Sequence, residues 1–211
     1  MLAVMADELG RTMKGGDVAG VVSASAFAVP ELLCANDGAE RLVDENDAAR
    51  GERHPLSDDG SAPMRVLLIA SAGGHWTELH RLRHAFVGTD CQFVSTAPGL
   101  APPIGDRAVL SVADTARDTI QTLVPAARSL WRIFRAFEPD LVVSTGAAPG
   151  ALALAIGRLF GARTIWIDSI ANSEGLSLSG RLVRPFADMR ITQWRHLADR
   201  QSSLRYLGQI L

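Results

Sequence analysis

The chain has 211 residues, of which 47% are apolar and 21% are charged. This balance is typical of an ordinary soluble globular protein and excludes a fibrous chain or one that is disordered throughout. The formal net charge of -2 gives no electrostatic reason for the surface to bind a polyanion, so we expect no nucleic acid as a partner.

Cysteine usage and hydropathy favour the reducing cytoplasm as the compartment. The two cysteines, Cys34 and Cys91, stand in segments of different composition and do not indicate a disulfide framework. No run of about 18 apolar residues occurs, so we expect no membrane-spanning helix. The nearest candidate, AGVVSASAFAVPELLCA, is interrupted by Pro30 and lacks the features of a secretory signal.

Residues 1–63 are expected to be a disordered N-terminal extension. The stretch from Asn36 to Ser61 is acidic, polar and nearly free of large apolar residues, so it cannot bury enough surface to offset the entropy of ordering. Because Met64 stands directly before the first predicted strand, a second interpretation is that translation begins there. Residues 64–211 form the predicted folded domain.

In this domain, short aliphatic runs alternate with segments of helical spacing. The runs predict strands at Val66–Ala70, Gln92–Ser95, Ala108–Val112, Leu141–Ser144, Thr164–Ile167 and Met189–Thr192. Helical spacing covers Leu79–Phe86 and Ile120–Phe137, and Ala151–Phe160 is apolar nearly all round. This order predicts a single Rossmann-like α/β domain with a mostly parallel sheet. Pro125 predicts either a kink or a fresh helix start inside Ile120–Phe137.

The sequence SAGGH, Ser71–His75, follows the first predicted strand. Ligands of open α/β sheets bind in the crevice beyond the carboxyl ends of the strands. Gly73 and Gly74 leave the backbone bare, so N–H groups at the start of the next helix can approach an anion such as phosphate. A tight turn without a ligand is the alternative, because short glycine motifs are weak signals. Neither a Walker loop nor GxGxxG is present, which disfavours a dehydrogenase.

His75 is expected to face the same crevice. A neutral imidazole there can take a proton from an attacking hydroxyl or donate a hydrogen bond to a phosphate. The alternative is a histidine that only caps or packs. His80 and His84 have the i, i+4 spacing of metal ligands, but with no third ligand at a suggestive spacing and with charged neighbours we expect a solvated helix face and no metal site.

Two further strand ends carry small or polar residues. STGAAPGA follows Leu141–Ser144 and opens a helix near Pro149. The third loop begins at Asp168-Ser169 and is polar. Together with the glycine turn, these loops favour a binding cleft more strongly than any one of them does.

The predicted helix Ile120–Phe137 carries a basic face. Arg128, Arg132 and Arg135 fall at i, i+4 and i+7, with Trp131 and Phe134 alongside. This pattern can contact anionic lipid headgroups. The alternative is a helix with one core face and one solvated arginine face.

Four segments, in their order and spacing, resemble the Alg14-like family of glycosyltransferase subunits, which includes bacterial exopolysaccharide proteins of the PssD type. They are SAGGHWTEL, DLVVSTGAAPG, IDSIANSEGLSLSGRLVRPFADMRITQW and YLG. The resemblance runs from about Met64 to Leu211. The first segment is also similar to the glycine-histidine turn of the transferase that adds N-acetylglucosamine to the lipid intermediate of peptidoglycan.

The resemblance implies half of a split GT-B glycosyltransferase. This chain would be the N-terminal half, on the acceptor side, and a separate Alg13-like chain would bind the nucleotide-sugar donor. The implied acceptor is a polyprenyl-diphosphate-linked glycan, and no cofactor is expected on this chain. The implied location is cytoplasmic, peripheral on the inner face of the cell membrane, and we expect activity only with the partner chain.

The resemblance also assigns site residues. His75 is the expected catalytic base. The acceptor diphosphate is expected at Ser71, Gly73, Gly74, Gly146, Asp168, Ser169 and Asn172. Asp168 replaces a glutamate usual in relatives, and Asn172 stands where many relatives have arginine. The expected membrane contacts are Arg128, Trp131, Arg132 and Arg135.

Two other functions stay open at this point. The chain can be a non-catalytic membrane scaffold that recruits and activates an Alg13-like catalytic partner. It can also be a self-sufficient nucleotide-binding enzyme such as an epimerase or a reductase, although the missing GxGxxG and the lack of a Tyr-x-x-x-Lys pair disfavour this.

Overall fold

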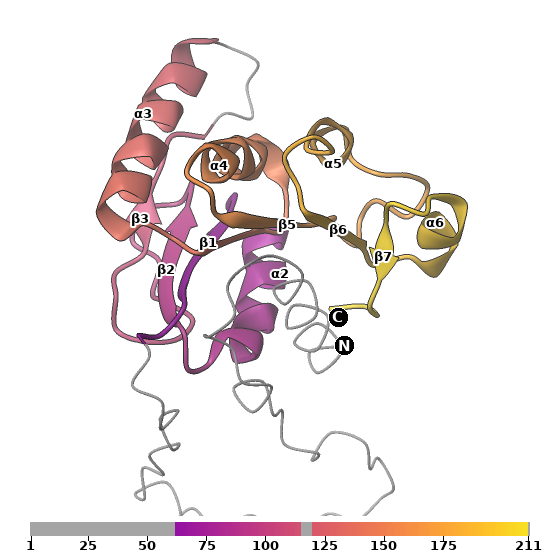
Figure 1. Cartoon of the computed structure of the whole chain (residues 1–211), viewed down its shortest axis with the longest axis horizontal. Coiled ribbons are helices and arrows are strands. Elements are labelled where there is room, and N and C mark those ends of the chain that lie inside the picture. Colours follow the sequence, from indigo (N-terminus) through magenta and orange to yellow (C-terminus); the bar gives the residue numbers. More distant parts are fainter. Residues whose placement is uncertain (1–61, 115–119, 211) are drawn as a thin grey trace, which may run out of the picture.

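The computed structural model describes residues 62–114 and 120–210 (Figure 1). The expectations for residues 1–61, which include the predicted disorder and Cys34, lie outside the described residues.

Seven strands form one sheet in the order β3-β2-β1-β4-β5-β6-β7. Every neighbouring pair is parallel. The strands are β1 (Arg65–Ala70), β2 (Asp90–Ser95), β3 (Leu110–Ser111), β4 (Leu141–Ser144), β5 (Arg163–Ile167), β6 (Met189–Thr192) and β7 (Arg205–Tyr206). The order runs outward in both directions from β1 and β4, so the switch point of a Rossmann-like sheet lies between these two strands.

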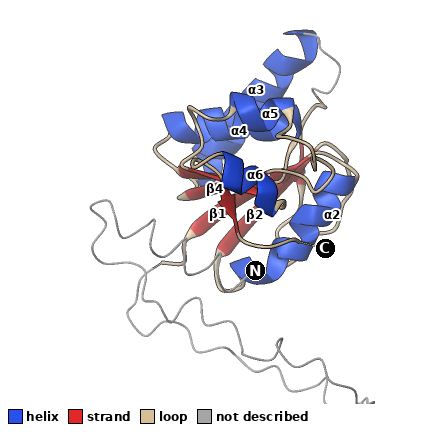
Figure 2. Cartoon of the chain, turned by 90° about the vertical axis from the view of Figure 1, so that its right-hand side faces the viewer, coloured by secondary structure: helices blue, strands red, loops and turns tan. Residues whose placement is uncertain are grey.

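Helices cover both faces of the sheet. They are α2 (Gly74–Arg81), the 3-10 helix η2 (Leu82–Phe86), α3 (Ile120–Phe137), α4 (Ala147–Leu159), α5 (Leu178–Leu182) and α6 (Arg195–Arg200). Helices α3, α4 and α5 lie on one side of the sheet and α2 lies on the other (Figures 1 and 2). The predicted single Rossmann-like α/β domain is confirmed.

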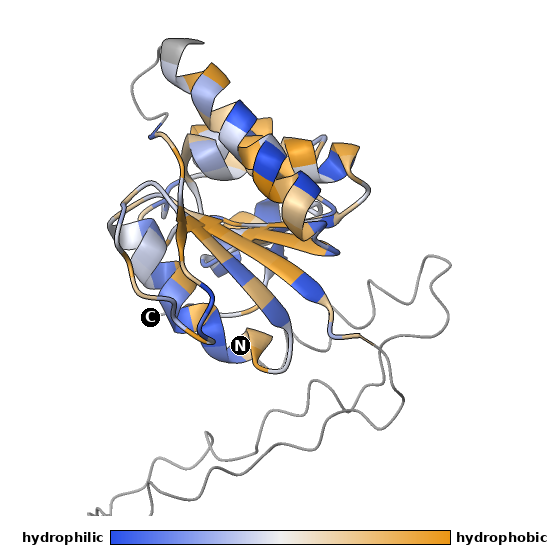
Figure 3. Cartoon of the chain, turned by 90° about the vertical axis from the view of Figure 1, so that its left-hand side faces the viewer, coloured by the Kyte–Doolittle hydropathy of each residue, from blue (hydrophilic) through white to orange (hydrophobic). Residues whose placement is uncertain are grey.

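Two hydrophobic clusters hold these layers together. Leu67 and Ile69 of β1 pack in the cluster under α3 and α4. Val66 and Leu68 pack in the cluster on the α2 side. Because side chains alternate along a strand, β1 is buried on both faces, and Figure 3 shows the strands as largely hydrophobic segments.

The predicted strands are confirmed within two residues, except that Ala108–Val112 contains only the two-residue strand β3. Strand β7 is not predicted by the sequence patterns. Helix α4 begins at Ala147, so Pro149 lies in its first turn as predicted.

Two details of α3 differ from the sequence patterns. The helix continues through Pro125, so the alternative of a fresh helix start there is excluded, while a kink stays a prediction. Pro125 has no N–H to donate to the preceding turn. Phe134 is fully buried and stacks on Phe160, so it faces the core instead of lying beside the arginines.

None of the helices within residues 62–114 and 120–210 is long and apolar enough to span a membrane.

Candidate functional site

The candidate site lies at the switch point of the sheet. The loop Ser71–Gly73 follows the carboxyl end of β1, and Thr145-Gly146 follows that of β4. Helices α2 and α4 begin at these loops and leave toward opposite faces of the sheet (Figure 2). The region between these two loops is where the sequence predicts the crevice, and two helix N-termini lie beside it.

His75 bridges the two loops. Its Nδ1 lies 2.9 Å from the carbonyl oxygen of Thr145, and the Thr145 hydroxyl donates to the His75 carbonyl oxygen at 2.7 Å. Because a carbonyl oxygen can only accept, the first bond places the proton of the neutral ring on Nδ1. The lone pair is then on Nε2, which makes no hydrogen bond to the described part of the chain. This is the tautomer that a proton-accepting histidine needs.

The lack of a side chain at Gly146 allows the β4 loop to lie close to the His75 ring. The φ of 145° at Gly146 lies outside the range that residues with a side chain adopt readily, and a Cβ at this position would overlap the Nδ1–Cε1 edge of His75. The Ser144 hydroxyl accepts from Gly146 N at 3.2 Å and holds the turn. Glycine is thus required here by both the backbone conformation and the space.

The N-termini of α2 and α4 carry no side-chain caps. The first N–H groups of a helix have no partner within the helix. In α2 these groups belong to Gly74, His75 and Trp76, and in α4 to Ala147 and Ala148. Two such N-termini at one crevice suit an anion with more than one phosphate.

Glu78 is a site residue that the sequence analysis missed. Only 4% of it is exposed, and its Oε1 accepts hydrogen bonds from Ser169 Oγ at 2.8 Å and from Ile170 N at 3.0 Å. Its Oε2 lies 4.0 Å from His75 Nδ1. The i, i+3 spacing of His75 and Glu78 on one helix is the signal that could have found it.

The loop after β5 forms the third wall, and its polar groups are largely bonded within the protein. Both Asp168 carboxylate oxygens accept from Ser177, one from its N–H at 3.0 Å and one from its hydroxyl at 2.6 Å. Trp166 Nε1 also donates to this carboxylate at 3.1 Å. Ser169 is bonded to Glu78. Asp168, at 1% exposed, therefore builds the wall of the crevice in this structure, and its contact with an acceptor stays a prediction.

The remaining predicted acceptor residues divide into two groups. Ser71 and Gly73 lie on the loop after β1, and Gly74 is the first residue of α2, directly before His75. Asn172 lies on the β5 loop, where its N–H donates to the Ser169 carbonyl oxygen at 3.0 Å. The structure therefore brings the three loops together, through the contacts of His75 with Thr145 and of Glu78 with Ser169, and binding of an acceptor among them stays a prediction.

A buried cation supports the β5 and β6 side of the fold. Arg190 donates to the Gly180 carbonyl oxygen at 3.2 Å and to Ser203 Oγ at 2.7 Å. Burial lowers the pKa of this guanidinium, and the nearby Asp168 acts in the opposite direction. In the described ranges, no three His, Cys, Asp or Glu side chains are grouped so that they could hold a metal ion.

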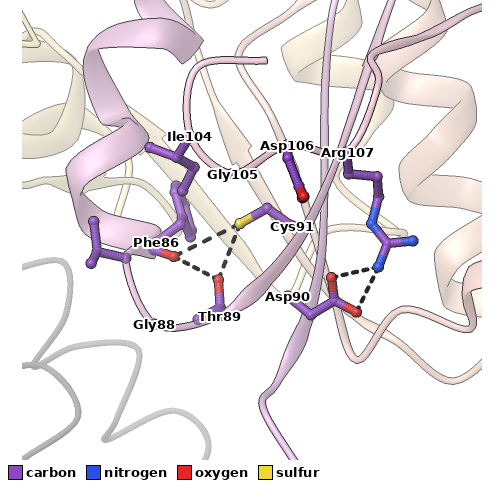
Figure 4. Close-up of a pocket in the computed structure, with 10 residues that line it drawn as sticks. Phe86, Gly88, Thr89, Asp90, Cys91, Ile104, Gly105, Asp106 and Arg107 are labelled. Atoms are coloured by element: carbon purple, nitrogen blue, oxygen red, sulfur yellow. Dashed lines mark hydrogen bonds and ion pairs between the residues drawn. The ribbon is translucent and has the colours of Figure 1, made fainter. Parts of the chain in front are cut away.

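A pocket of about 350 Å³ lies at the other end of the sheet, at the start of β2 (Figure 4). Four of its polar side chains are already paired with one another. Arg107 bonds Asp90 at 2.8 Å, and Cys91 Sγ lies 3.1 Å from Thr89 Oγ1. Burial raises the pKa of the Cys91 thiol. The pocket does not include any residue of the crevice.

The helical layer exposes basic and apolar side chains together. Arg128, Arg132 and Arg135 of α3 are exposed, and Trp131 beside them is 44% exposed. On α5, Leu178 and Leu182 are 69% and 62% exposed. These side chains belong to helices on the same side of the sheet (Figure 1).

Comparison with known proteins decides the family. A family model described as "Oligosaccharide biosynthesis protein Alg14 like" matches residues 105–210, which is half of the chain. This chain belongs to the Alg14-like family. A relative from Eremothecium gossypii, named UDP-N-acetylglucosamine transferase subunit ALG14, is 28% identical over an alignment that covers 71% of this chain and 81% of the relative.

Solved structures share the fold of this Alg14-like chain. MurG of Acinetobacter baumannii aligns with a TM-score of 0.53 and 13% identity, covering 68% of this chain and 45% of that one. UDP-N-acetylglucosamine 2-epimerase from Rickettsia bellii aligns with a TM-score of 0.53 and 14% identity, covering 70% and 45%. The Alg14-like chain therefore spans about half the length of these proteins. At such low identity the likeness shows the fold alone.

Proposed function

We propose that this Alg14-like chain is the acceptor-side, membrane-associating subunit of a two-chain glycosyltransferase. The complete enzyme transfers a sugar from a nucleotide sugar to a lipid-linked acceptor. The observation that carries this proposal is the crevice at the switch point, where His75 and two uncapped helix N-termini meet.

The crevice suits the diphosphate of a polyprenyl-linked acceptor. Unpaired N–H groups at the starts of α2 and α4 favour negative charge, and they do so without a metal ion or a basic side chain. Gly73 and Gly74 allow the anion to approach the backbone closely because neither glycine has a side chain.

His75 is placed to act as the general base. The acceptor O–H bond breaks, its proton moves to Nε2 of His75, and its electron pair forms the new bond to the anomeric carbon. The bond from that carbon to the nucleoside diphosphate breaks, and its electrons leave on the phosphate oxygen. UDP-N-acetylglucosamine is the first donor to test because the Eremothecium gossypii relative carries it in its name.

A partner chain is part of the proposal for two reasons. The relatives are named as subunits. This chain also aligns with only 45% of MurG. We therefore place the nucleotide-sugar donor on an Alg13-like chain that supplies the other GT-B half.

The helical layer supports a peripheral position on the inner face of the cell membrane. Arginines on α3 can pair with anionic headgroups, while Trp131, Leu178 and Leu182 can enter the interfacial region. This surface alone would also suit a non-catalytic scaffold that recruits the partner chain.

A reconstituted transfer assay tests the proposal and separates it from the scaffold. The chain is co-purified with a candidate Alg13-like partner, and transfer from UDP-N-acetylglucosamine to a polyprenyl-diphosphate-linked acceptor is measured for each chain alone and for the pair. We expect transfer only from the pair. His75→Ala should lower turnover about 10²-fold to 10⁴-fold, since general-base catalysis contributes that much, while His80→Ala on the exposed part of α2 should not.

Transfer by one chain alone, or no transfer by a stable pair, would contradict the two-chain proposal. Near-normal turnover of His75→Ala would leave only the scaffold role for this chain.

A further inference from the structure

The Glu78 carboxylate is left incompletely satisfied inside the protein. Its Oε2 is buried and has no hydrogen-bond partner, and in the described part of the chain no other buried side-chain nitrogen or oxygen is in this state. Burying a carboxylate oxygen without a donor is unfavourable, so such a group calls for an explanation.

The ring of His75 lies beside this oxygen. Nδ1 lies 4.0 Å from Glu78 Oε2 and 2.9 Å from the Thr145 carbonyl oxygen, so the ring sits between a neutral and a charged acceptor. A small rotation of the ring moves the Nδ1 proton from one acceptor toward the other.

No other described charged group is placed to do the same. The β4 loop presents only the Thr145 carbonyl oxygen and the Gly146 backbone to the ring. On the β5 loop, Asp168 is bonded to Ser177 and Trp166. Glu78 is therefore the charge that His75 meets when its ring becomes protonated.

We propose that Glu78 is the positioning residue of His75, and that its buried Oε2 stabilises the imidazolium formed when Nε2 takes the acceptor proton. This inference rests on the proposed function for the origin of that proton. The pairing of the two side chains does not depend on it.

Glu78 also couples the base to the loop after β5. Its Oε1 accepts from Ser169 Oγ and Ile170 N, so one carboxylate holds that loop against α2 and faces His75 with its other oxygen. The same side chain thereby orients the base and fixes the wall beside it.

Glu78→Gln tests the charge while sparing the loop, because an amide oxygen can still accept from Ser169 and Ile170. The protonation midpoint of the His75 ring is followed by NMR in the full chain, with His75→Gln used to assign its signal. We expect the midpoint to fall, since an opposite charge beside the ring favours its protonated form. Glu174→Gln, an exposed change on the same loop, should leave it unchanged.

Ser169→Ala serves as the second variant and keeps the test open if Glu78→Gln fails to fold. It removes one hydrogen bond to the loop but retains the charge of Glu78, so the His75 midpoint should move much less than in Glu78→Gln. An unchanged midpoint in folded Glu78→Gln, or an equal fall in both variants, would overturn the proposal.

Activity of the two-chain enzyme gives the second readout. Because the base must be neutral, the acid limb of the kcat/KM profile should move to lower pH in Glu78→Gln by the same amount, with a lower plateau. If the NMR midpoint shifts but no wild-type pair of chains shows transfer, the proposed function is contradicted. The pairing of Glu78 with His75 would still be supported.

Discussion

At the scale of single residues, the position of His75 depends on the absence of a side chain at Gly146. The ring edge of His75 occupies the space that a Cβ would need, and the backbone there has a φ of 145°. His75 therefore packs directly against the β4 loop, although 70 residues separate His75 from Thr145 in the chain.

Gly146→Ala should destabilise the protein and displace the base. We expect a loss of about 1 to 2 kcal/mol in the free energy of unfolding from the backbone conformation and a further 1 to 3 kcal/mol from the overlap with His75. Urea unfolding measures the sum. Transfer activity should fall as in His75→Ala.

Gly161→Ala is the matched control, because Gly161 also has a positive φ of 78° but has open space around its missing Cβ. In Gly161→Ala, the free energy of unfolding should fall only by the part that comes from the backbone conformation, and transfer activity should be unchanged. Equal losses of stability in the two variants would show that the contact between Gly146 and His75 is not a tight one.

The glycines and His75 can be recognised from the sequence, because the turn follows an aliphatic run within a few residues. Glu78 and Thr145 cannot be assigned from local pattern in this way. Their roles arise from contacts with distant segments, such as the bond from Ser169 to Glu78 across 91 positions. Only the i, i+3 spacing on α2 hints at the pairing with His75.

At the scale of elements, the exposed face of α3 combines three arginines with Trp131, and α5 adds Leu178 and Leu182. Exposed apolar side chains beside basic ones are an arrangement that favours an anionic lipid surface.

Arg128→Ala/Arg132→Ala should weaken binding to anionic liposomes about 30-fold, since each arginine near such a surface contributes about 1 kcal/mol. Flotation with phosphatidylserine-containing vesicles measures this. The control is Arg81→Ala/Arg83→Ala, which removes the same charge from α2 and η2 on the other side of the sheet and should bind like wild type. Absence of wild-type binding, or equal weakening by the two variants, would remove the membrane role of α3.

The sequence predicts the buried elements well, because each central strand is a short apolar run bounded by polar or small residues. It fails for β7, where Arg205 and Tyr206 are exposed and show no apolar alternation. The start of α4 is predicted because a proline is favoured in the first turn of a helix, where Pro149 lies. The pattern is less reliable for Phe134, which lies next to arginines in the sequence but faces the buried cluster of Leu130 on the helix.

At the scale of the whole molecule, the Alg14-like chain has the architecture of one Rossmann-like half and covers less than half of MurG. His75 and the N-termini of α2 and α4 lie at the carboxyl ends of β1 and β4, where we propose that the donor-binding half faces this chain. In this proposal, the half described here recognises the acceptor and not the nucleotide sugar.

The most direct measurement is an NMR titration of the full chain with two ligands, a short-chain prenyl-diphosphate-linked N-acetylglucosamine and UDP-N-acetylglucosamine. We expect saturable shifts of the backbone amide signals at Gly73–Trp76 and Ala147–Ala148 with the prenyl-linked ligand, at an affinity at least about ten times that for the nucleotide sugar, equivalent to about 1.4 kcal/mol. Tighter binding of UDP-N-acetylglucosamine at these same amides would contradict it and make this chain the donor half.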